Sequence, residues 1–235
     1  MNRDIDKFHE YGYVIITDFL TKDEHDKLND ECQRLSDLAV YVDGRPDKYW
    51  VVDSDDTPIK LDGCMKRSGK FYRLGRNKKL VESARRILGI KDIDTHISKF
   101  FPMVPKKGFS VDWHQDNFYI GADPEKLISC DVFVNGADKE NGCLRILLDS
   151  QHKEFPHNLS SHGVFRWIEN QGWDNIIDIE LDEPFAILFH PMLVHGCYRN
   201  TSNRSRFSIA WEYIARDHVP SKFNNHYSQD RLKIT

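Results

Sequence analysis

The region from residue 91 to residue 216 most constrains the fold, because it is a succession of short runs rich in β-branched and aromatic residues. Such runs, separated by turn signals, are typical of β-strands. The expected strands lie at 93–101, 127–135, 143–148, 176–181, 185–189 and 207–214. Asn141-Gly142, a dipeptide typical of tight turns, lies between the second and the third. Many short strands and few helices predict a β-sandwich or a β-barrel.

The first 90 residues have a different, mostly helical pattern. Thr21-Lys-Asp-Glu24 is a capping box, and the apolar residues after it recur at helical spacing. Further helices are expected at 4–11 and 78–88, each followed by a glycine, and a strand at 13–17. Between residues 40 and 68 the periodicity fades and Gly, Pro and Asp are frequent. We expect this segment to be a loop or a lid.

Length and composition favour one domain. A chain of 235 residues, 40% of them hydrophobic, can bury a sizeable core. The sequence shows neither an internal repeat nor a low-complexity linker. We therefore expect a single domain over residues 1–235, in which 1–90 gives helical support and a lid and 91–216 forms the β core.

Charge, cysteine count and hydropathy exclude several classes of protein. A net charge of −4 argues against a nucleic-acid surface, which needs a basic stripe. The apolar runs are all shorter than the roughly 18 residues of a membrane span, and the charged N-terminus has no apolar signal region. The five cysteines are odd in number and lack Cys-x-x-Cys spacing, which indicates neither a disulfide framework nor a zinc site. We expect a cytoplasmic protein without a nucleic-acid or membrane partner.

A candidate metal site is divided between two distant parts of the chain. His114 and Asp116 are two positions apart, and side chains at this spacing share one face of a strand. His195 supplies a second imidazole, and Arg206 follows it. Two histidines and one carboxylate form the facial triad of non-haem Fe(II) oxygenases, which leaves coordination positions open. The planar guanidinium of an arginine suits a carboxylate ligand, because it can form a bidentate pair.

A single His-x-Asp pair is weak evidence, because most such pairs are ordinary polar residues. The surrounding motifs strengthen it: Trp113-His-Gln-Asp116, Asn141-Gly-Cys-Leu-Arg-Ile146 with His152 after it, and His195-Gly-Cys-Tyr-Arg-Asn200 followed by Arg206. Together they resemble the phytanoyl-CoA dioxygenase family of Fe(II)/2-oxoglutarate oxygenases, from Phe8 to about Tyr213. The resemblance implies a mainly β protein with flanking helices, whose core is the double-stranded β-helix, a jelly-roll or cupin-like barrel.

The resemblance also implies roles for individual residues. His114, Asp116 and His195 would hold Fe(II), and 2-oxoglutarate and O2 would be the co-substrates. Arg206 would bind the C5 carboxylate of 2-oxoglutarate, and the hydroxyl of Ser208, two residues on, would assist it. A further contact is expected from Ser98, although either Ser98 or Lys99 could point into the barrel beside the iron. Another is expected from Lys60, which aligns with a lysine that contacts 2-oxoglutarate in the family. The alternative for Lys60 and the nearby Lys66 is that both are solvated on a mobile loop.

By the same resemblance, the reaction would oxidise an unactivated C–H bond, most simply by hydroxylation, and release succinate and CO2. Halogenating relatives carry a small residue where this chain has Asp116, so halogenation is disfavoured. The chain departs from the family at Glu183-Pro184, where Gly-Asp is common, and at Asp149–His152, where Gly-Ser-His is usual. These departures put close kinship with the acyl-CoA hydroxylase in doubt. The chain also has little room for a CoA domain, so a small metabolite is the expected substrate.

The substrate pocket and some alternatives stay open at this point. Aromatic residues near the metal motif could line a pocket, and core packing would explain them equally well: Trp113, Phe118, Tyr119 and Phe133. His152, His157 and His162 are expected in loops at its rim, because a spacing of five suits neither a helix face nor a strand face. Three other functions remain: desaturation or cyclisation by the same iron chemistry, a non-catalytic metal-binding barrel, and a cupin-like zinc or manganese protein. The last would need a third histidine in place of Asp116 and would not need Arg206.

Overall fold

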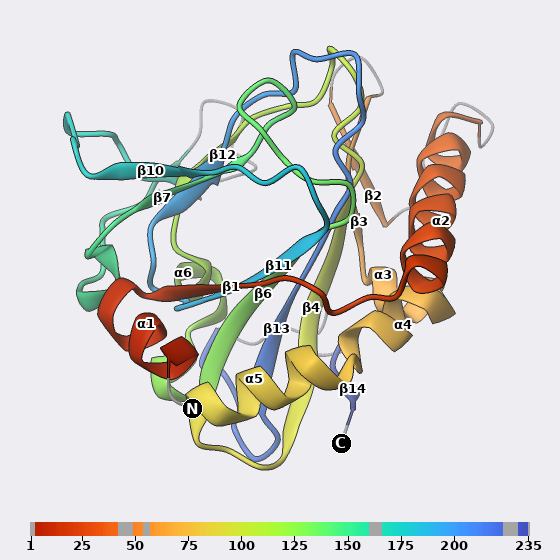
Figure 1. Ribbon diagram of the computed structural model, residues 1–235. Coiled ribbons are helices and arrows are strands. Elements are labelled where there is room, and N and C mark those ends of the chain that lie inside the picture. The colour runs from red at the N-terminus through yellow and green to blue at the C-terminus, as the bar shows by residue number, and fades with distance from the viewer. Residues whose placement is uncertain (1–2, 42–48, 54–56, 160–165, 223–229, 235) are drawn as a thin grey trace.

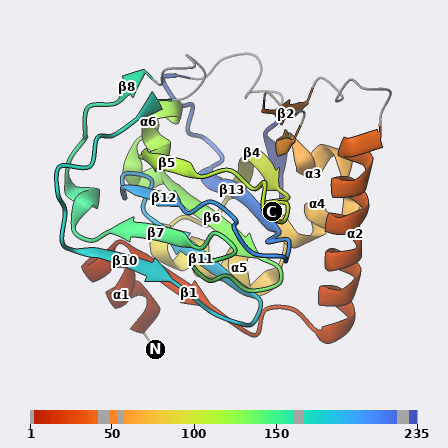
Figure 2. The same ribbon diagram turned by 90° about the horizontal axis from the view of Figure 1, so that it is seen from above.

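The computed structural model describes residues 3–41, 49–53, 57–159, 166–222 and 230–234, and these form two antiparallel sheets that face each other. The larger sheet contains, in spatial order, β1 (Tyr13–Ile16), β11 (Phe185–Phe189), β6 (Leu127–Phe133), β13 (Ser208–Ala215), β4 (Ile93–Phe101), β3 (Pro58–Asp62) and β2 (Trp50–Val52), with β14 (Leu232–Lys233) also paired to β4. The smaller sheet contains β10 (Ile176–Ile179), β7 (Leu144–Leu147), β12 (His195–Cys197) and β5 (Val111–His114). A separate ribbon pairs β8 (Asn158–Leu159) with β9 (Arg166–Trp167). Figures 1 and 2 show the smaller sheet lying over the larger one, which is the double-stranded β-helix.

The helices cover the outer face of the larger sheet. They are α1 (Arg3–Tyr11), α2 (Lys22–Tyr41), α3 (Cys64–Arg67), α4 (Gly69–Gly75) and α5 (Lys78–Leu88), while α6 (Asp116–Ile120) lies between β5 and β6 in the chain. Short 3-10 helices occupy Pro124–Lys126 and Ser150–His152. In Figure 1, α1 and α5 lie across the lower part of the view and α2 stands at the right. The molecule therefore has three layers: the helices, the larger sheet and the smaller sheet.

Alternation along the central strands separates a structural face from a functional face. On β13, Ile209, Trp211 and Tyr213 belong to the core cluster beneath the helices. Ser208 and Glu212, which alternate with them along the strand, line a pocket between the sheets. Because successive side chains of a strand point to opposite faces, each central strand packs the helices and builds the pocket at once. Both faces are covered, and every residue of β13 is buried.

Several elements lie where the sequence predicts them. Helix α5 begins after Asn77, whose side chain accepts hydrogen bonds from the Lys79 and Leu80 amides, and Gly89 ends it with φ of 66°. The capping box at α2 is present: the Thr21 amide donates to Glu24 Oε2 at 2.8 Å, and the Glu24 amide donates to Thr21 Oγ1 at 3.3 Å. Strands β4 and β11 have the predicted bounds.

The expectation of a loop over residues 40–68 is wrong in the part that the structure describes. Residues 58–62 form β3, which pairs with β4 through Leu61 opposite Phe100 and Asp62 opposite Lys99. Residues 64–67 form α3. The pairing partner lies far along the chain, so local periodicity could not reveal the strand. Residues 42–48 and 54–56 of the expected loop lie outside the described residues.

Within the described part of the chain, the helices are all too short or too polar to cross a membrane. The five cysteines are buried and free. The cytoplasmic location stays a prediction.

Candidate active site

The candidate metal ligands meet where the smaller sheet brings β5 and β12 together. His114 and His195 are directly paired residues of these strands, and their ring centroids are 4.2 Å apart. Asp116 does not lie on the strand as predicted, because β5 ends at His114 and Asp116 is the first residue of α6. Gln115 between them keeps an extended backbone (φ −116°, ψ 127°), so the two side chains still converge. The three ligand atoms lie within 4.8 Å of one another.

A backbone carbonyl two residues earlier in the chain holds each histidine in the tautomer that a metal requires. His114 Nδ1 lies 2.8 Å from the Asp112 carbonyl, and His195 Nδ1 lies 2.9 Å from the Leu193 carbonyl. A carbonyl oxygen can only accept, so each Nδ1 carries the proton and each Nε2 presents its lone pair to the site. Burial, together with the neighbouring His114, lowers the pKa of His195 to about 4. This imidazole is therefore neutral at physiological pH.

Asp116 is oriented by a neighbouring strand. Ser129 on β6 donates its hydroxyl proton to Asp116 Oδ2 at 2.7 Å, while Oδ1 lies 3.6 Å from His114 Nε2 and 3.9 Å from His195 Nε2. Burial acts to raise the pKa of this carboxyl, but His195 and His114 hold it well below its usual value. Asp116 is thus a carboxylate with one oxygen anchored and the other facing the two imidazoles.

The turn between the ligands is fixed by contacts that the sequence did not reveal. Gln115 is fully buried; its side chain donates to the carbonyls of Lys153 and Met192 and accepts from the Phe155 amide. The backbone amide of Gln115 donates a hydrogen bond to His157 Nε2 at 3.1 Å. His157 therefore supports the backbone of the metal motif through its contact with Gln115. His152 lies in a 3-10 helix, and His162 lies outside the described residues.

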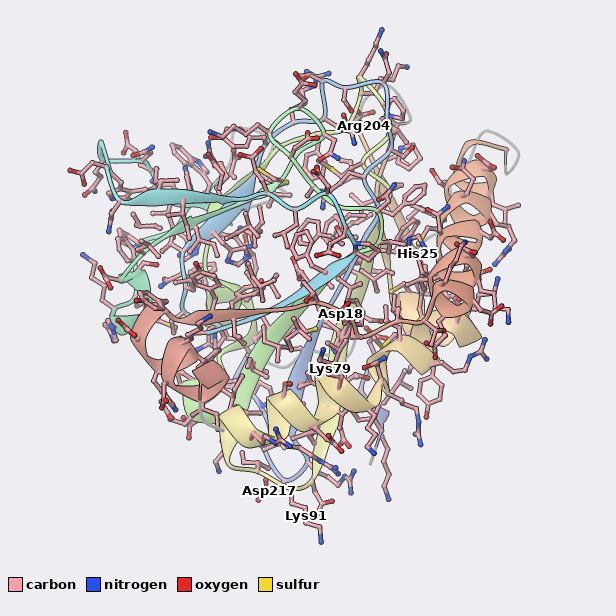
Figure 3. All side chains as sticks on the ribbon, in the orientation of Figure 1. Asp18, His25, Lys79, Lys91, Arg204 and Asp217 are labelled. Atoms are coloured by element: carbon pink, nitrogen blue, oxygen red, sulfur yellow. The ribbon has the colours of Figure 1, made fainter. Side chains whose placement is uncertain are left out.

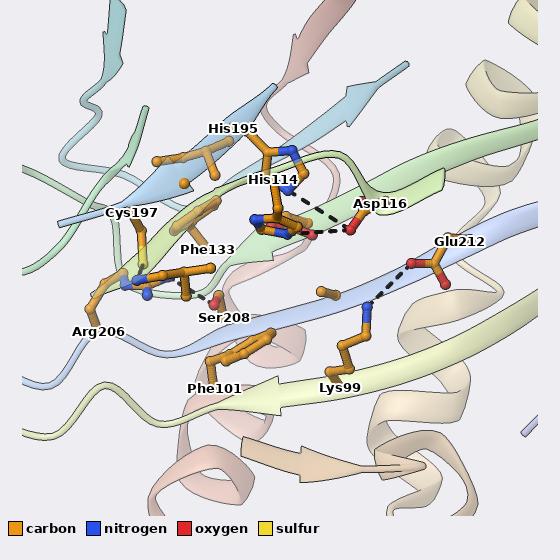
Figure 4. A pocket seen from close by; sticks show the side chains of 15 residues that line it. Lys99, Phe101, His114, Asp116, Phe133, His195, Cys197, Arg206, Ser208 and Glu212 are labelled. Atoms are coloured by element: carbon orange, nitrogen blue, oxygen red, sulfur yellow. Dashed lines mark hydrogen bonds and ion pairs between the residues drawn. The ribbon is translucent and has the colours of Figure 1, made fainter. Parts of the chain in front are cut away.

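Arg206 and Ser208 line the same pocket as the three candidate ligands (Figure 4). Arg206 is 3% exposed and donates from Nη1 to the Ser208 hydroxyl at 2.8 Å. Its Nε is buried and lacks a hydrogen-bond partner among the described residues. Its guanidinium carbon lies 5.0 Å from the centre of the Phe133 ring, which also lines the pocket. A buried cation with an unused donor suits an anionic ligand such as a carboxylate.

Three ionisable side chains lie on the floor of this pocket, and the sequence indicated one of them, Lys99, as a residue that could point into the barrel, but neither Asp131 nor Glu212. Asp131 on β6 and Lys99 on β4 flank Ala210 of β13 on its two sides, and Lys99 Nζ lies 3.4 Å from Glu212 Oε1. Burial raises the pKa of Glu212 to about 8, and burial with the charge of Asp116 raises that of Asp131 to about 7. Carboxyls that keep their protons near neutrality can donate to an anion. The available signal was a charged residue within a strand that is otherwise apolar.

A second, larger cavity of about 330 Å³ adjoins the first and shares Lys99, Phe101, Val111, His114 and Asp116 with it. Its other lining residues come from β2, β3, β4, β5, α6 and the segment before β5: Val51, Lys60, Ile97, Phe109, Ser110, Asp112, Tyr119 and Ile120. Tyr119 lies 6.2 Å from His114, ring centre to ring centre. The candidate metal site therefore lies at the junction of two cavities.

Other predicted site residues lie elsewhere. Ser98 points away from Lys99 and bonds Asp230 and the Met65 amide, so it lines neither of these two cavities. Trp113 packs against Trp173 and under Arg145, and Phe118 stacks on His157 at 4.0 Å. Both aromatics support the metal motif from outside the two cavities, whereas Phe133 and Tyr119 each line one of them. Lys66 lies on α3, away from both linings.

Comparison with known proteins gives a consistent result. Residues 8–208 match the family model of phytanoyl-CoA dioxygenase (PhyH). The chain is 30% identical to the peroxisomal phytanoyl-CoA dioxygenase of Mus musculus over 232 residues, which cover 89% of this chain and 67% of that protein. It is 24% identical to a probable alpha-ketoglutarate-dependent hypophosphite dioxygenase of Stutzerimonas stutzeri, over 91% of this chain and 78% of the relative.

Solved structures share the fold at lower identity. The non-heme alpha-ketoglutarate-dependent carbocyclase SnoK from nogalamycin biosynthesis superposes with a TM-score of 0.79 at 17% identity, over 100% of this chain and 96% of that one. EctD from S. alaskensis, solved with 2-oxoglutarate and 5-hydroxyectoine, superposes with a TM-score of 0.73 at 19% identity, over 92% and 76% of the two chains. These likenesses establish the shared architecture.

Proposed function

The chain belongs to the phytanoyl-CoA dioxygenase family of Fe(II)/2-oxoglutarate-dependent oxygenases, and we propose that it hydroxylates an unactivated C–H bond of a small metabolite. Succinate and CO2 would be released from 2-oxoglutarate in the same reaction. His114, Asp116 and His195 would hold the iron, and Arg206 with Ser208 would bind the far carboxylate of 2-oxoglutarate.

One observation carries the proposal: the candidate ligands line the same pocket as Arg206, a buried arginine whose Nε has no hydrogen-bond partner among the described residues. A structural metal site would be closed by a fourth protein ligand, and such a site has no need of Arg206. A two-histidine, one-carboxylate set leaves coordination positions for a bidentate co-substrate and for O2. The donor set and Arg206 therefore fit iron and a dicarboxylate together.

The residues of this chain contribute binding, orientation and charge. Iron with 2-oxoglutarate supplies the oxidising chemistry when both are bound. Arg206, being buried, offers its charge in a low-dielectric setting, where a charge-assisted pair with a carboxylate is strong. Glu212 and Asp131 at the floor of the pocket are neutral when protonated, and in that form they would not repel the negatively charged co-substrate. Lys60, predicted to contact 2-oxoglutarate, faces the larger cavity, and Ser98 is the least supported of the predicted contacts.

The size of the larger cavity supports a small substrate. At about 330 Å³ it lies at the lower end of the range for small-molecule sites. It adjoins His114 and Asp116, so a molecule bound there would present a C–H bond beside the iron. An acyl-CoA thioester is much larger than this cavity.

The test is co-substrate turnover followed by product analysis. We expect Fe(II)-dependent formation of succinate from 2-oxoglutarate, stimulated by the true substrate, and a product that has gained one oxygen atom from O2. A product that has lost two hydrogens would replace hydroxylation by desaturation or cyclisation. An iron-loaded protein that neither binds nor consumes 2-oxoglutarate would contradict the proposal and favour a non-catalytic or cupin-like metal protein.

A further inference from the structure

Two lysines from neighbouring strands face the larger cavity. Lys60 lies on β3 and Lys99 on β4, and the register that pairs Asp62 with Lys99 puts both lysines on the inner side of the sheet. Their side chains are only 13% and 20% exposed. Two ammonium groups buried near one another are costly unless negative charge compensates them.

The acidic residues that contact the two lysines are not part of the cavity lining. Lys60 Nζ pairs with Asp62 Oδ1 at 2.9 Å, and Lys99 Nζ pairs with Glu212 Oε1 at 3.4 Å. Neither Asp62 nor Glu212 is among the described residues that line the larger cavity. Each ammonium group thus contacts one acidic residue outside the lining, and its lysine, with three donors on that group, also borders the cavity.

The remaining charges of the cavity leave it net positive. His114 and Asp116 would be committed to the metal, which leaves Lys60, Lys99 and Asp112 as the other charged lining residues. Asp112 is exposed at the start of the metal motif, whereas both lysines are partly buried in the wall. The pKa of Lys60 is lowered, first by burial and also by the charge of Lys99, while Asp62 opposes this shift. Both lysines line the same cavity, so a single ligand group in it can contact both.

We propose that the larger cavity binds a small substrate bearing a carboxylate or a comparable oxyanion, which Lys60 and Lys99 hold beside the metal site. This inference rests on the proposed oxygenase function and names the substrate class for it. Aromatic and aliphatic side chains complete the wall and suit an apolar remainder: Val51, Ile97, Phe101, Phe109, Tyr119 and Ile120. A cationic substrate is disfavoured, because Glu212 and Asp131 line the Arg206 pocket and not this cavity. Arg206 lies in the other pocket, which separates the substrate anion from the anchor of the co-substrate.

The experiment compares three probes with one skeleton and different charge: phenylpropanoate, phenylpropanamide and phenylpropylamine. Their binding is measured by calorimetry without oxygen, both in the protein loaded with Fe(II) and 2-oxoglutarate and in the metal-free protein. We expect the acid to bind about tenfold or more tightly than the amide, the difference expected of a charge-assisted contact, and the amine to bind least. Equal binding of acid and amide, preference for the amine, or binding of none of the three would overturn the proposal.

Variants assign the preference to the two lysines. Lys60→Met and the paired variant Lys99→Met/Glu212→Gln should each lose the preference for the acid while 2-oxoglutarate still binds. The paired variant replaces both partners of the Lys99–Glu212 contact by neutral side chains, so no unpaired charge can form there. Lys91→Met, which changes an exposed lysine at the bottom of Figure 3, is the matched control and should behave as the wild type. If Lys60→Met instead weakens 2-oxoglutarate and leaves the acid unaffected, Lys60 serves the co-substrate and the proposal fails. Failure of the wild type to bind 2-oxoglutarate would sink the oxygenase function, while the metal-free measurement still tests the acid preference.

Discussion

At the scale of single residues, the candidate metal site is organised by hydrogen bonds on the side away from the metal. Backbone carbonyls fix both imidazoles, and Ser129 fixes one oxygen of Asp116. Such contacts orient ligands before the ion arrives, and losing one typically lowers metal affinity by 10–100-fold, as an order of magnitude. Ser129 is thus a positioning residue that does not itself touch the metal.

Ser129→Ala should weaken Fe(II) binding about tenfold or more without unfolding the protein, because Asp116 loses the bond that orients it. The measurement is competition for Fe(II) against a chelator of known affinity. Ser36→Ala, which removes another buried serine from α2, is the control and should leave metal affinity unchanged. Equal metal affinities for the wild type and Ser129→Ala would show that the serine has no positioning role.

Arg206→Met should raise the KM for 2-oxoglutarate by about one to two orders of magnitude, since charge-assisted hydrogen bonds contribute roughly 1.5–3 kcal/mol each. Arg206→Lys should recover only part of this, because an ammonium cannot form the bidentate pair. Arg204, at the top of Figure 3, offers the control: it is 59% exposed and pairs with Asp138. If Arg204→Met and Arg206→Met have the same effect, Arg206 does not anchor the co-substrate.

The sequence predicted the residues whose chemistry is carried by local spacing. His114 and Asp116 are recognisable two positions apart, and Arg206 and Ser208 likewise. Lys99, Asp131 and Glu212 have no such local pattern, because strand pairing brings them together from β4, β6 and β13. Their charge within apolar strands was the one visible sign.

At the scale of elements, the metal site depends on the close approach of β5 and β12. Gly196 lies between His195 and Cys197 on β12, and a Cβ atom there would lie only 2.6 Å from the Val111 carbonyl oxygen of β5. Because the obstacle is backbone, it cannot rotate away. Glycine at this position allows the two histidine-bearing strands to pair.

Gly196→Ala should therefore push β5 from β12, lower the free energy of unfolding by about 1–3 kcal/mol, and weaken Fe(II) binding. Thermal unfolding with and without Fe(II) measures both effects. Gly69→Ala is the matched control, since its added Cβ would meet nothing nearer than the Arg73 side chain at 3.7 Å. Wild-type metal affinity in Gly196→Ala would contradict the role given to this close approach.

Elements with strong local signals were predicted well, and elements defined by distant partners were not. Helix α5 has the predicted bounds, and Gly89 ends it as expected. Strand β3 was missed because its stabilising partner is β4, and the end of β5 was misplaced because the chain turns into α6 at Asp116. In both cases tertiary contacts, which a single sequence does not display, decide the structure.

At the scale of the whole molecule, the buried acids make stability depend on pH. The folded-state pKa values of Asp131 and Glu212 are raised to about 7 and about 8, while in the unfolded chain both carboxyls are ionised above roughly pH 5. The folded state then holds protons that the unfolded state has lost, so their contribution is present at low pH and is lost as pH rises through the folded values.

The metal-free protein should accordingly lose stability between about pH 5 and pH 8, by up to about 1.4 kcal/mol per pH unit for each group. Urea unfolding at a series of pH values measures the slope. In Glu212→Gln, which cannot ionise, the slope should be shallower. A stability that rises over this interval in the wild type would contradict the raised pKa values.

The proposed function requires that iron and 2-oxoglutarate bind together at His114, Asp116, His195 and Arg206. The most direct measurement is an anaerobic titration with Fe(II) and 2-oxoglutarate that follows the weak visible charge-transfer band of the chelate. We predict a band in the wild type and no band in His114→Ala. In Arg206→Met the band should appear only at a much higher concentration of 2-oxoglutarate. An iron-loaded wild-type protein without this band would contradict the proposed function.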